Sequence, residues 1–231
     1  MKKIILCIEI FVISLFFLIP PLFIKPEYIT INLALSYNSI ILLLISLLLF
    51  YQFEYLKSNK LIINTKKQFV KESLICLLLL KLLTFFLIFI FCQLKIDITN
   101  PVEYQIENKF IFFISVFLNF LISAFFEECI YRLFLPFIIY NFFVKIYNLI
   151  NIKIKNTKLI ILGKIIIELF SITIFALSHR YSGFINVTNA FFSGIILRYF
   201  AIKNKTILIG TVSHFLYNSI NFILYITEKL F

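Results

Sequence analysis

Long runs of apolar residues, separated by short polar segments, divide this 231-residue chain into candidate membrane spans. A helix needs about 20 predominantly apolar residues to cross a hydrocarbon core of about 30 Å. Runs of roughly this length or longer occupy 4–23, 33–53, 73–93, 110–143, 159–179, 184–200 and 206–227. This pattern predicts an all-α fold, a polytopic transmembrane helical bundle with about seven or eight spans. No small-x-small cleavage site follows the first run, so we expect it to be an uncleaved span.

The run 110–143 has two interpretations. At 1.5 Å per residue it is longer than one bilayer crossing requires. It is either one tilted or kinked helix with its break at Pro136, or two spans that meet near Glu127. The charge pattern favours one crossing.

Charge sets the expected orientation. Only 14% of the residues are charged, against about a quarter in soluble domains. If 110–143 crosses once, most Lys and Arg residues fall on the side of Lys2 and Lys3, in segments 57–71, 145–158 and 198–205. The positive-inside rule makes this side cytoplasmic. We therefore expect a multi-pass protein of the cell membrane with a cytoplasmic N-terminus, and we assign the net charge of +11 to contacts with lipid headgroups, not with nucleic acid.

Three polar groups interrupt the apolar runs of the C-terminal half. They are Glu127-Glu128-Cys129-Ile130-Tyr131-Arg132, Phe175-Ala-Leu-Ser-His179 and His214-Phe-Leu-Tyr-Asn218. Ionisable residues inside a bilayer are expensive and are by default functional candidates. Taken singly, His179 fits an interfacial anchor as well as a functional residue, and His214 fits an interhelical hydrogen-bond partner at least as well as a catalytic residue. The three groups together indicate one polar site inside the helical bundle.

The residues of the first polar group have different expected roles. Glu128 and Arg132 are four residues apart, so they share a helix face and can pair, which lowers the cost of burying both charges. Glu127 points about 100° away and is available for proton chemistry. Cys129 beside Glu128 is a nucleophile candidate, but burial as a small hydrophobe is the favoured interpretation.

The remaining intramembrane polar residues carry less weight. Lys81 is solitary, and Lys164 and Glu168 have the i, i+4 spacing of a neutralising pair. Close helix packing is expected at three glycines, Gly163, Gly194 and Gly210. The four cysteines form no Cys-x-x-Cys pair, so neither a zinc knuckle nor a disulfide framework is indicated.

These residue types suit hydrolysis of a peptide bond. A carboxylate and a histidine can deprotonate a water, and a second histidine with an asparagine amide can donate hydrogen bonds to the developing oxyanion. Glu127, His179 and His214 also match a set of zinc ligands around an activated water. The sequence does not separate these schemes, so the cofactor stays open, with a divalent metal such as zinc as one alternative.

The ordered triple Glu-Glu-x-x-x-Arg, Phe-x-x-x-His and His-x-x-x-Asn resembles the CPBP (CAAX protease and bacteriocin-processing) intramembrane proteases. This family includes type II CAAX prenyl endopeptidases and bacterial abortive-infection and bacteriocin self-immunity proteins. The resemblance covers about 110–225. Family members often have Phe-Arg-Gly where this chain has Tyr131-Arg132-Leu133.

The resemblance implies a role for each matching residue. The catalytic set is Glu127, His179, His214 and Asn218, and the supporting set is Glu128, Arg132 and Phe175. Glu127 matches the essential carboxylate and His179 the histidine that assists it or holds a metal. His214 and Asn218 match the oxyanion donors or ligands.

We therefore expect N-terminal membrane helices in 1–108 and a catalytic membrane core with a polar cavity in 109–225. The expected activity is endoproteolysis of a membrane-associated peptide or protein. The alternatives are a non-catalytic immunity or peptide-binding membrane protein, a proton-coupled transporter and, last, a haem protein. The oligomeric state is not indicated. The simple topology places His179 and His214 near opposite membrane faces, so a shared site requires a tilted or broken span, first of all 159–179.

Overall fold

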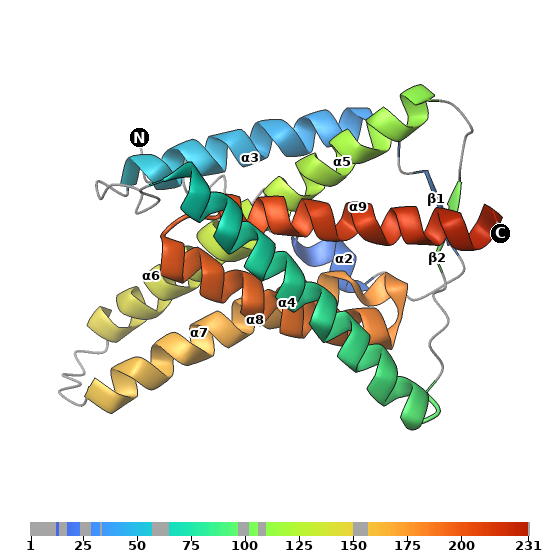
Figure 1. Cartoon of the computed structure of the whole chain (residues 1–231). Helices are drawn as coiled ribbons and strands as arrows, with labels where there is room; N and C mark the ends of the chain where they lie inside the picture. The colour runs from blue at the N-terminus through green and yellow to red at the C-terminus, as the bar shows by residue number, and fades with distance from the viewer. Residues whose placement is uncertain are drawn as a thin grey trace.

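The computed structural model describes residues 13, 18–23, 29–32, 34–56, 65–96, 102–105, 110–149 and 157–230, and within them it is a bundle of helices (Figure 1). The α-helices are α2 (Ile19–Phe23), α3 (Tyr37–Leu56), α4 (Lys66–Gln93), α5 (Phe110–Glu128), α6 (Leu135–Leu149), α7 (Thr157–Ser178), α8 (Phe184–Asn204) and α9 (Leu208–Leu230). A π-helical segment η2 (Cys129–Phe134) joins α5 to α6, and a 3₁₀ turn η3 (Arg180–Ser182) separates α7 from α8.

Two four-residue strands accompany the helices. Strand β1 (Ile29–Asn32) pairs in parallel with β2 (Val102–Gln105), with Ile29 opposite Val102. In the view of Figure 1 the pair lies at the same end of the molecule as the C-terminus. The expectation of an all-α fold holds for the bundle, to which this pair adds a short parallel ladder.

The protein is a multi-pass membrane protein by the length and apolarity of its helices. Four described segments are long and apolar enough to cross a bilayer, namely Lys66–Gln93, Phe110–Val144, Ile161–Ser178 and Phe184–Asn204. Helices α3 and α9 form where spans 33–53 and 206–227 were expected. Most of span 4–23, with the N-terminus, lies outside the described residues. The total of seven or eight spans and the orientation therefore stay predictions.

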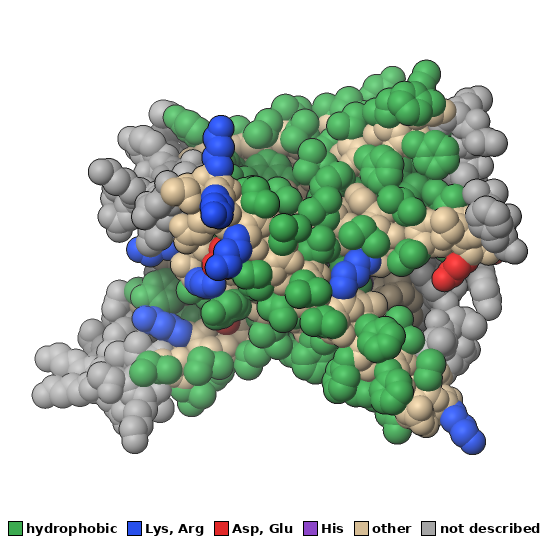
Figure 2. Space-filling view, in the orientation of Figure 1, with side chains coloured by type: hydrophobic (Ala, Val, Ile, Leu, Met, Phe, Trp, Pro, Cys, Tyr) green, Lys and Arg blue, Asp and Glu red, His purple; other side chains and the backbone are tan. Residues whose placement is uncertain are grey.

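The surface agrees with this assignment. Figure 2 shows apolar side chains over most of the visible face, and Lys and Arg side chains gathered at one end, where α4 begins. Lys66, Lys67 and Lys71 are exposed there. This is the arrangement that a basic cytoplasmic side would produce.

The run from Phe110 to Leu149 is continuous, which supports one crossing instead of two. Its α-helical pattern is interrupted by η2, which ends at Phe134, two residues before Pro136. Proline has no N–H to donate four residues back, so the carbonyl of Arg132 loses its helical partner. The Leu135 N–H bonds to the carbonyl of Ile130, five residues earlier. The break expected at Pro136 is therefore present as a π-helical turn.

Close packing occurs at two of the three predicted glycines. A Cβ on Gly194 of α8 would lie 3.0 Å from Ile172 and 3.2 Å from Phe175, both on α7. A Cβ on Gly210 of α9 would lie 2.7 Å from Glu128 Oε2. The prediction for Gly163 is wrong, because nothing lies within 4 Å of its Cβ position.

The inclination of α7 removes the topological conflict between the two histidines. In Figure 1, α6 and α7 run side by side and extend obliquely beyond the start of α9. The C-terminal end of α7 consequently reaches the middle of the bundle. His179, at that end, can meet His214 even though His214 lies in the first third of α9.

Candidate active site

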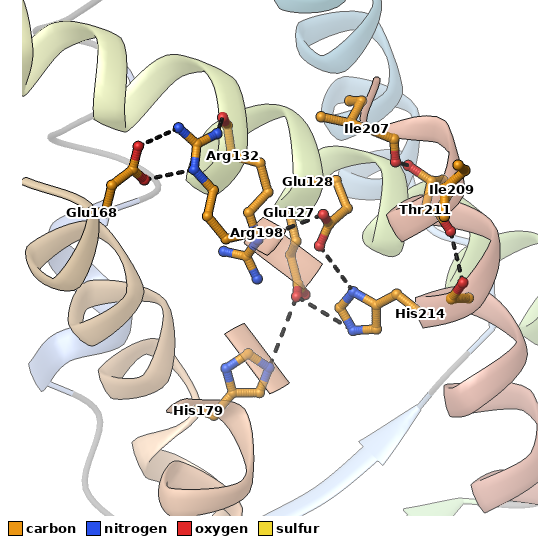
Figure 3. Close-up of polar contacts among 11 residues, drawn as sticks. Glu127, Glu128, Arg132, Glu168, His179, Arg198, Ile207, Ile209, Thr211 and His214 are labelled. Carbon is orange, nitrogen blue, oxygen red and sulfur yellow. Dashed lines mark hydrogen bonds and ion pairs between the residues drawn. The ribbon is translucent and has the colours of Figure 1, made fainter. Parts of the chain in front are cut away.

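Three elements bring the predicted polar groups together (Figure 3). Glu127 and Glu128 end α5, His179 directly follows α7, and His214 lies on α9. These residues are separated by up to 87 positions in the chain, so only the fold places them side by side.

Glu127 lies at the centre of this group. Its Oε2 atom is 3.9 Å from Nε2 of His179 and 3.8 Å from Nε2 of His214. The side chains of Glu127 and His179 are 24% and 25% exposed, whereas that of His214 is 9% exposed. Glu127 and His179 are thus partly exposed, and His214 forms the buried wall. The Oε2 atom of Glu127 is itself buried and has no hydrogen-bond partner among the described residues.

The ring of His179 is oriented by the end of its own helix. Its Nδ1 lies 3.0 Å from the main-chain carbonyl oxygen of Phe175 and 3.3 Å from Oγ of Ser178. A carbonyl oxygen only accepts hydrogen bonds, so the Nδ1–H tautomer is favoured. In that tautomer Nε2 carries a lone pair and faces Glu127. His179 can therefore accept a proton or a hydrogen bond at the centre of the site.

His214 faces a carboxylate on each side of its ring. Its Nδ1 is 3.6 Å from Oε1 of Glu128, in addition to the Nε2 contact with Glu127. Glu128 Oε2 in turn lies 3.6 Å from Nε of Arg132, and both of these side chains are fully buried. The predicted contact between Glu128 and Arg132 is present. Glu128 also lies beside His214, which the sequence did not indicate.

Phe175 forms a buried platform under the site. The guanidinium of Arg132 lies 4.4 Å from the centroid of its ring, at cation–π distance. The rings of His179 and His214 pack edge-on against it, with centroids 4.8 Å and 6.4 Å away. One ring thus contacts His179, His214 and Arg132, in agreement with the supporting role expected of Phe175.

Asn218 lies one turn beyond His214 on α9, as its spacing requires, and is half-buried. In the described part of the chain its amide has no hydrogen-bond partner. The structure therefore brings Glu127, His179 and His214 into mutual contact and leaves Asn218 beside them with an unoccupied donor. Its role stays a prediction.

An ion pair that the sequence did not reveal supports the π-helical turn. Arg198 of α8 donates from Nε to Oε2 of Glu168 on α7, at 2.6 Å, and from Nη1 to the main-chain carbonyl of Arg132, at 2.6 Å. This is the carbonyl that Pro136 leaves without a helical donor. Pro136, four residues after Arg132, was the available signal for an unpaired carbonyl.

This ion pair corrects two expectations. Glu168 is paired with Arg198, so the pairing predicted between Lys164 and Glu168 is wrong. The side chain of Arg198 is only 18% exposed and points into the bundle, so it does not belong with the basic residues of a membrane face.

Two further side chains border the site. Tyr181 lies in η3, directly after His179, and burial raises the pKa of its phenol, which the negative charge of Glu127 raises further. The phenol therefore stays protonated at neutral pH. Cys129 is fully buried and donates to the carbonyl of Ser46 on α3, at 3.5 Å, so it acts as a packing residue.

The positions of the side chains also bear on metal binding. Among the described residues, no group of three His, Cys, Asp and Glu side chains is placed to hold a metal ion. A zinc ion shared by Glu127, His179 and His214 therefore stays a prediction, and no step below is routed through one.

Comparison with known proteins gave one match. The model of a family described as Rce1-like, type II CAAX prenyl endopeptidase Rce1-like, matches residues 109–220. Neither the curated proteins nor the solved structures gave a match. The matched segment contains all three polar groups, and the match confirms the resemblance stated from their motifs.

Proposed function

Residues 109–220 belong to the Rce1-like family of type II CAAX prenyl endopeptidases, and we propose from this premise that the protein is an intramembrane endopeptidase. Its substrate is a membrane-associated peptide or protein. The division into N-terminal helices, 1–108, and a catalytic core, 109–225, is part of this proposal.

The observation that carries the proposal is the position of Glu127 between two histidines. Atoms 3.8–3.9 Å apart, as Glu127 Oε2 is from both Nε2 atoms, can both lie within about 2.8 Å of one water oxygen. Glu127 and His179 both offer acceptor atoms there. A water held between them would have its proton drawn to a base while its oxygen faces the peptide carbonyl.

The proposed reaction is general-base hydrolysis. Glu127 takes a proton from the water as its oxygen bonds to the carbonyl carbon, and His179 Nε2 accepts the second hydrogen bond of that water. N–H groups of His214 and Asn218 donate to the oxyanion. When the C–N bond breaks, the protonated Glu127 gives its proton to the leaving amine. Water is thereby consumed and two peptides are produced.

The supporting residues have separate tasks in this scheme. Glu128 lies beside Nδ1 of His214, and Arg132 compensates the buried charge of Glu128. Phe175 supports the guanidinium and both imidazole rings. Such positioning matters because displacement of catalytic groups by about 1 Å can lower the rate about 100-fold.

The test uses purified protein in lipid nanodiscs with fluorogenic lipidated peptides. Glu127→Gln, His179→Ala and His214→Ala should each lower kcat/KM by about 100- to 10,000-fold, as expected for loss of general-base catalysis. Glu228→Gln removes an exposed carboxylate near the end of α9 and is the matched control. Full activity of Glu127→Gln would overturn the mechanism. Peptide binding without cleavage by the wild-type protein would support the non-catalytic alternative.

A further inference from the structure

Lys81 is a basic residue in the middle of an apolar helix, and the proposed chemistry does not use it. It is half-buried on α4, within the candidate span Lys66–Gln93. A charged side chain at such a position is expensive and by default indicates a functional site.

The ammonium group of Lys81 is held by neutral atoms of α9. Its Nζ donates to Oδ1 of Asn221 at 2.5 Å and approaches the main-chain oxygen of Tyr217 at 3.5 Å. It also lies 4.6 Å from the centroid of the Tyr217 ring. An ammonium has three N–H donors, so one remains for a ligand.

The charge of Lys81 is not balanced by a protein carboxylate in the described part of the chain. The two arginines inside the bundle are balanced: Arg132 lies beside Glu128, and Arg198 beside Glu168. Lys81 differs from them in having only neutral partners. An incoming anion would therefore interact more favourably with Lys81 than with a basic residue that already has a carboxylate beside it.

Interhelical attachment does not require this charge. Neutral side chains already connect α4 to α9, because Tyr217 Oη of α9 lies 2.7 Å from Thr84 Oγ1 of α4. Tyr217 Oη also accepts from Asn189 Nδ2 of α8 at 2.8 Å. An uncharged residue at position 81 would leave these bonds in place.

The position of Lys81 relative to the candidate active site is set by α9. Asn221 follows His214 by seven residues, which is two helical turns along the same face and about 10 Å. Asn218 lies between them on this face. An extended peptide advances about 3.3–3.6 Å per residue, so about three residues span this distance.

We propose that Lys81 and the amide of Asn221 form a binding site for a carboxylate of the peptide substrate, about three residues from the reacting bond. Lys81 would supply its third N–H, and Asn221 its Nδ2, which has no acceptor among the described residues. The carboxylate belongs to an acidic side chain or to a free C-terminus. This inference rests on the proposed peptidase function, which it deepens by assigning a substrate charge.

The test compares four forms of one lipidated peptide. The C-terminus is free or amidated, and the third residues on the two sides of the scissile bond are either both Glu or both Gln. Lys81→Met keeps an unbranched side chain of similar length but removes the charge. It should raise KM for the preferred carboxylate form about 10- to 100-fold, which corresponds to the free energy of one hydrogen bond to a charged group. It should leave the amide forms within about twofold. Lys81→Glu should reverse the preference towards peptides with Lys at that position. Lys164→Glu on α7 is the matched control.

The affinity of each peptide form for the Glu127→Gln protein, which should not cleave it, separates this inference from the proposed function. Selective binding of a carboxylate form, lost in the Glu127→Gln/Lys81→Met double variant, supports the site, and the form preferred identifies the source of the carboxylate. Equal affinity for all four forms overturns the site even if the wild-type protein cleaves them. Equal losses in kcat for all forms would also overturn it, because they indicate a purely structural role. Absence of cleavage with selective binding would overturn the peptidase and leave the site.

Discussion

Nδ1 of His179 lies 3.0 Å from the main-chain oxygen of Phe175, one turn earlier at the end of α7. This contact favours a tautomer whose Nε2 lone pair faces Glu127. The same residue, Phe175, supports the ring of His179 from below. The main chain and the side chain of one residue thus orient the histidine that borders the water-activating carboxylate.

The platform role predicts that Phe175 affects activity beyond its contribution to stability. Phe175→Leu keeps an apolar side chain but removes the ring face that contacts Arg132 and both histidines. We expect kcat to fall at least about tenfold, with a loss of at most about 1.5 kcal/mol in unfolding free energy. Phe175→Ala should cost about 3–5 kcal/mol. Parallel activity and thermal-unfolding measurements check this, and full activity of Phe175→Leu would contradict the role.

Close approach of α9 to Glu128 predicts a sharp effect at Gly210. In Gly210→Ala the added Cβ would lie 2.7 Å from Glu128 Oε2, so the carboxylate must move away from His214. Activity should fall at least about tenfold. Gly163→Ala is the matched control, because its Cβ meets nothing within 4 Å and alanine favours the helix. Equal behaviour of the two variants in kinetic and unfolding assays would disprove the steric account.

The bond from Arg198 to the carbonyl of Arg132 predicts a stabilising role for this ion pair. Arg198→Met leaves both that carbonyl and Glu168 without their donor, which should cost about 1–3 kcal/mol. Arg198→Lys retains the charge but not the planar fork, so it should recover part of this loss. In Glu168→Gln the arginine keeps its bond to the carbonyl, and the effect should be smaller. Melting temperatures measured in nanodiscs should be lowest for Arg198→Met and higher for Arg198→Lys and Glu168→Gln. An unchanged melting temperature for Arg198→Met would contradict the assignment.

The mechanism proposed for Glu127 and His179 also predicts that catalysis is independent of a bound transition metal. Chelation with 1,10-phenanthroline, followed by its removal, should leave kcat/KM within about twofold of the untreated value, since Glu127 and His179 need no metal to accept the proton. Metal analysis of the active protein should show well under one zinc per chain. Stoichiometric zinc whose removal abolishes activity, and whose return restores it, would establish the metal-bound alternative.

Local sequence pattern predicted the main helices and the residues of the site. Apolar run length predicted α3 to α9, and the spacing of Glu128 and Arg132 predicted their contact. Both follow from helix geometry, which relates residues three or four positions apart. The motif order then predicted that Glu127, His179 and His214 share one place in the bundle.

Contacts between distant helices could not be predicted in this way. Arg198 and Glu168 are 30 residues apart, and their pairing depends on the packing of α7 against α8 around Gly194. Lys81 reaches Asn221 across 140 positions. The inclination of α7, which brings His179 to His214, likewise results from packing and not from a periodic pattern. Pro136 is an intermediate case, because it marked the break but not the arginine that supports it.

The central claim is that Glu127 activates water for peptide hydrolysis. It is tested most directly by mass spectrometry of membrane peptides from cells that contain equal amounts of the wild-type or the Glu127→Gln protein. The account predicts a set of cleaved membrane peptides that is present with the wild-type protein and absent with Glu127→Gln. Identical peptide sets from the two, at equal protein level, would contradict it.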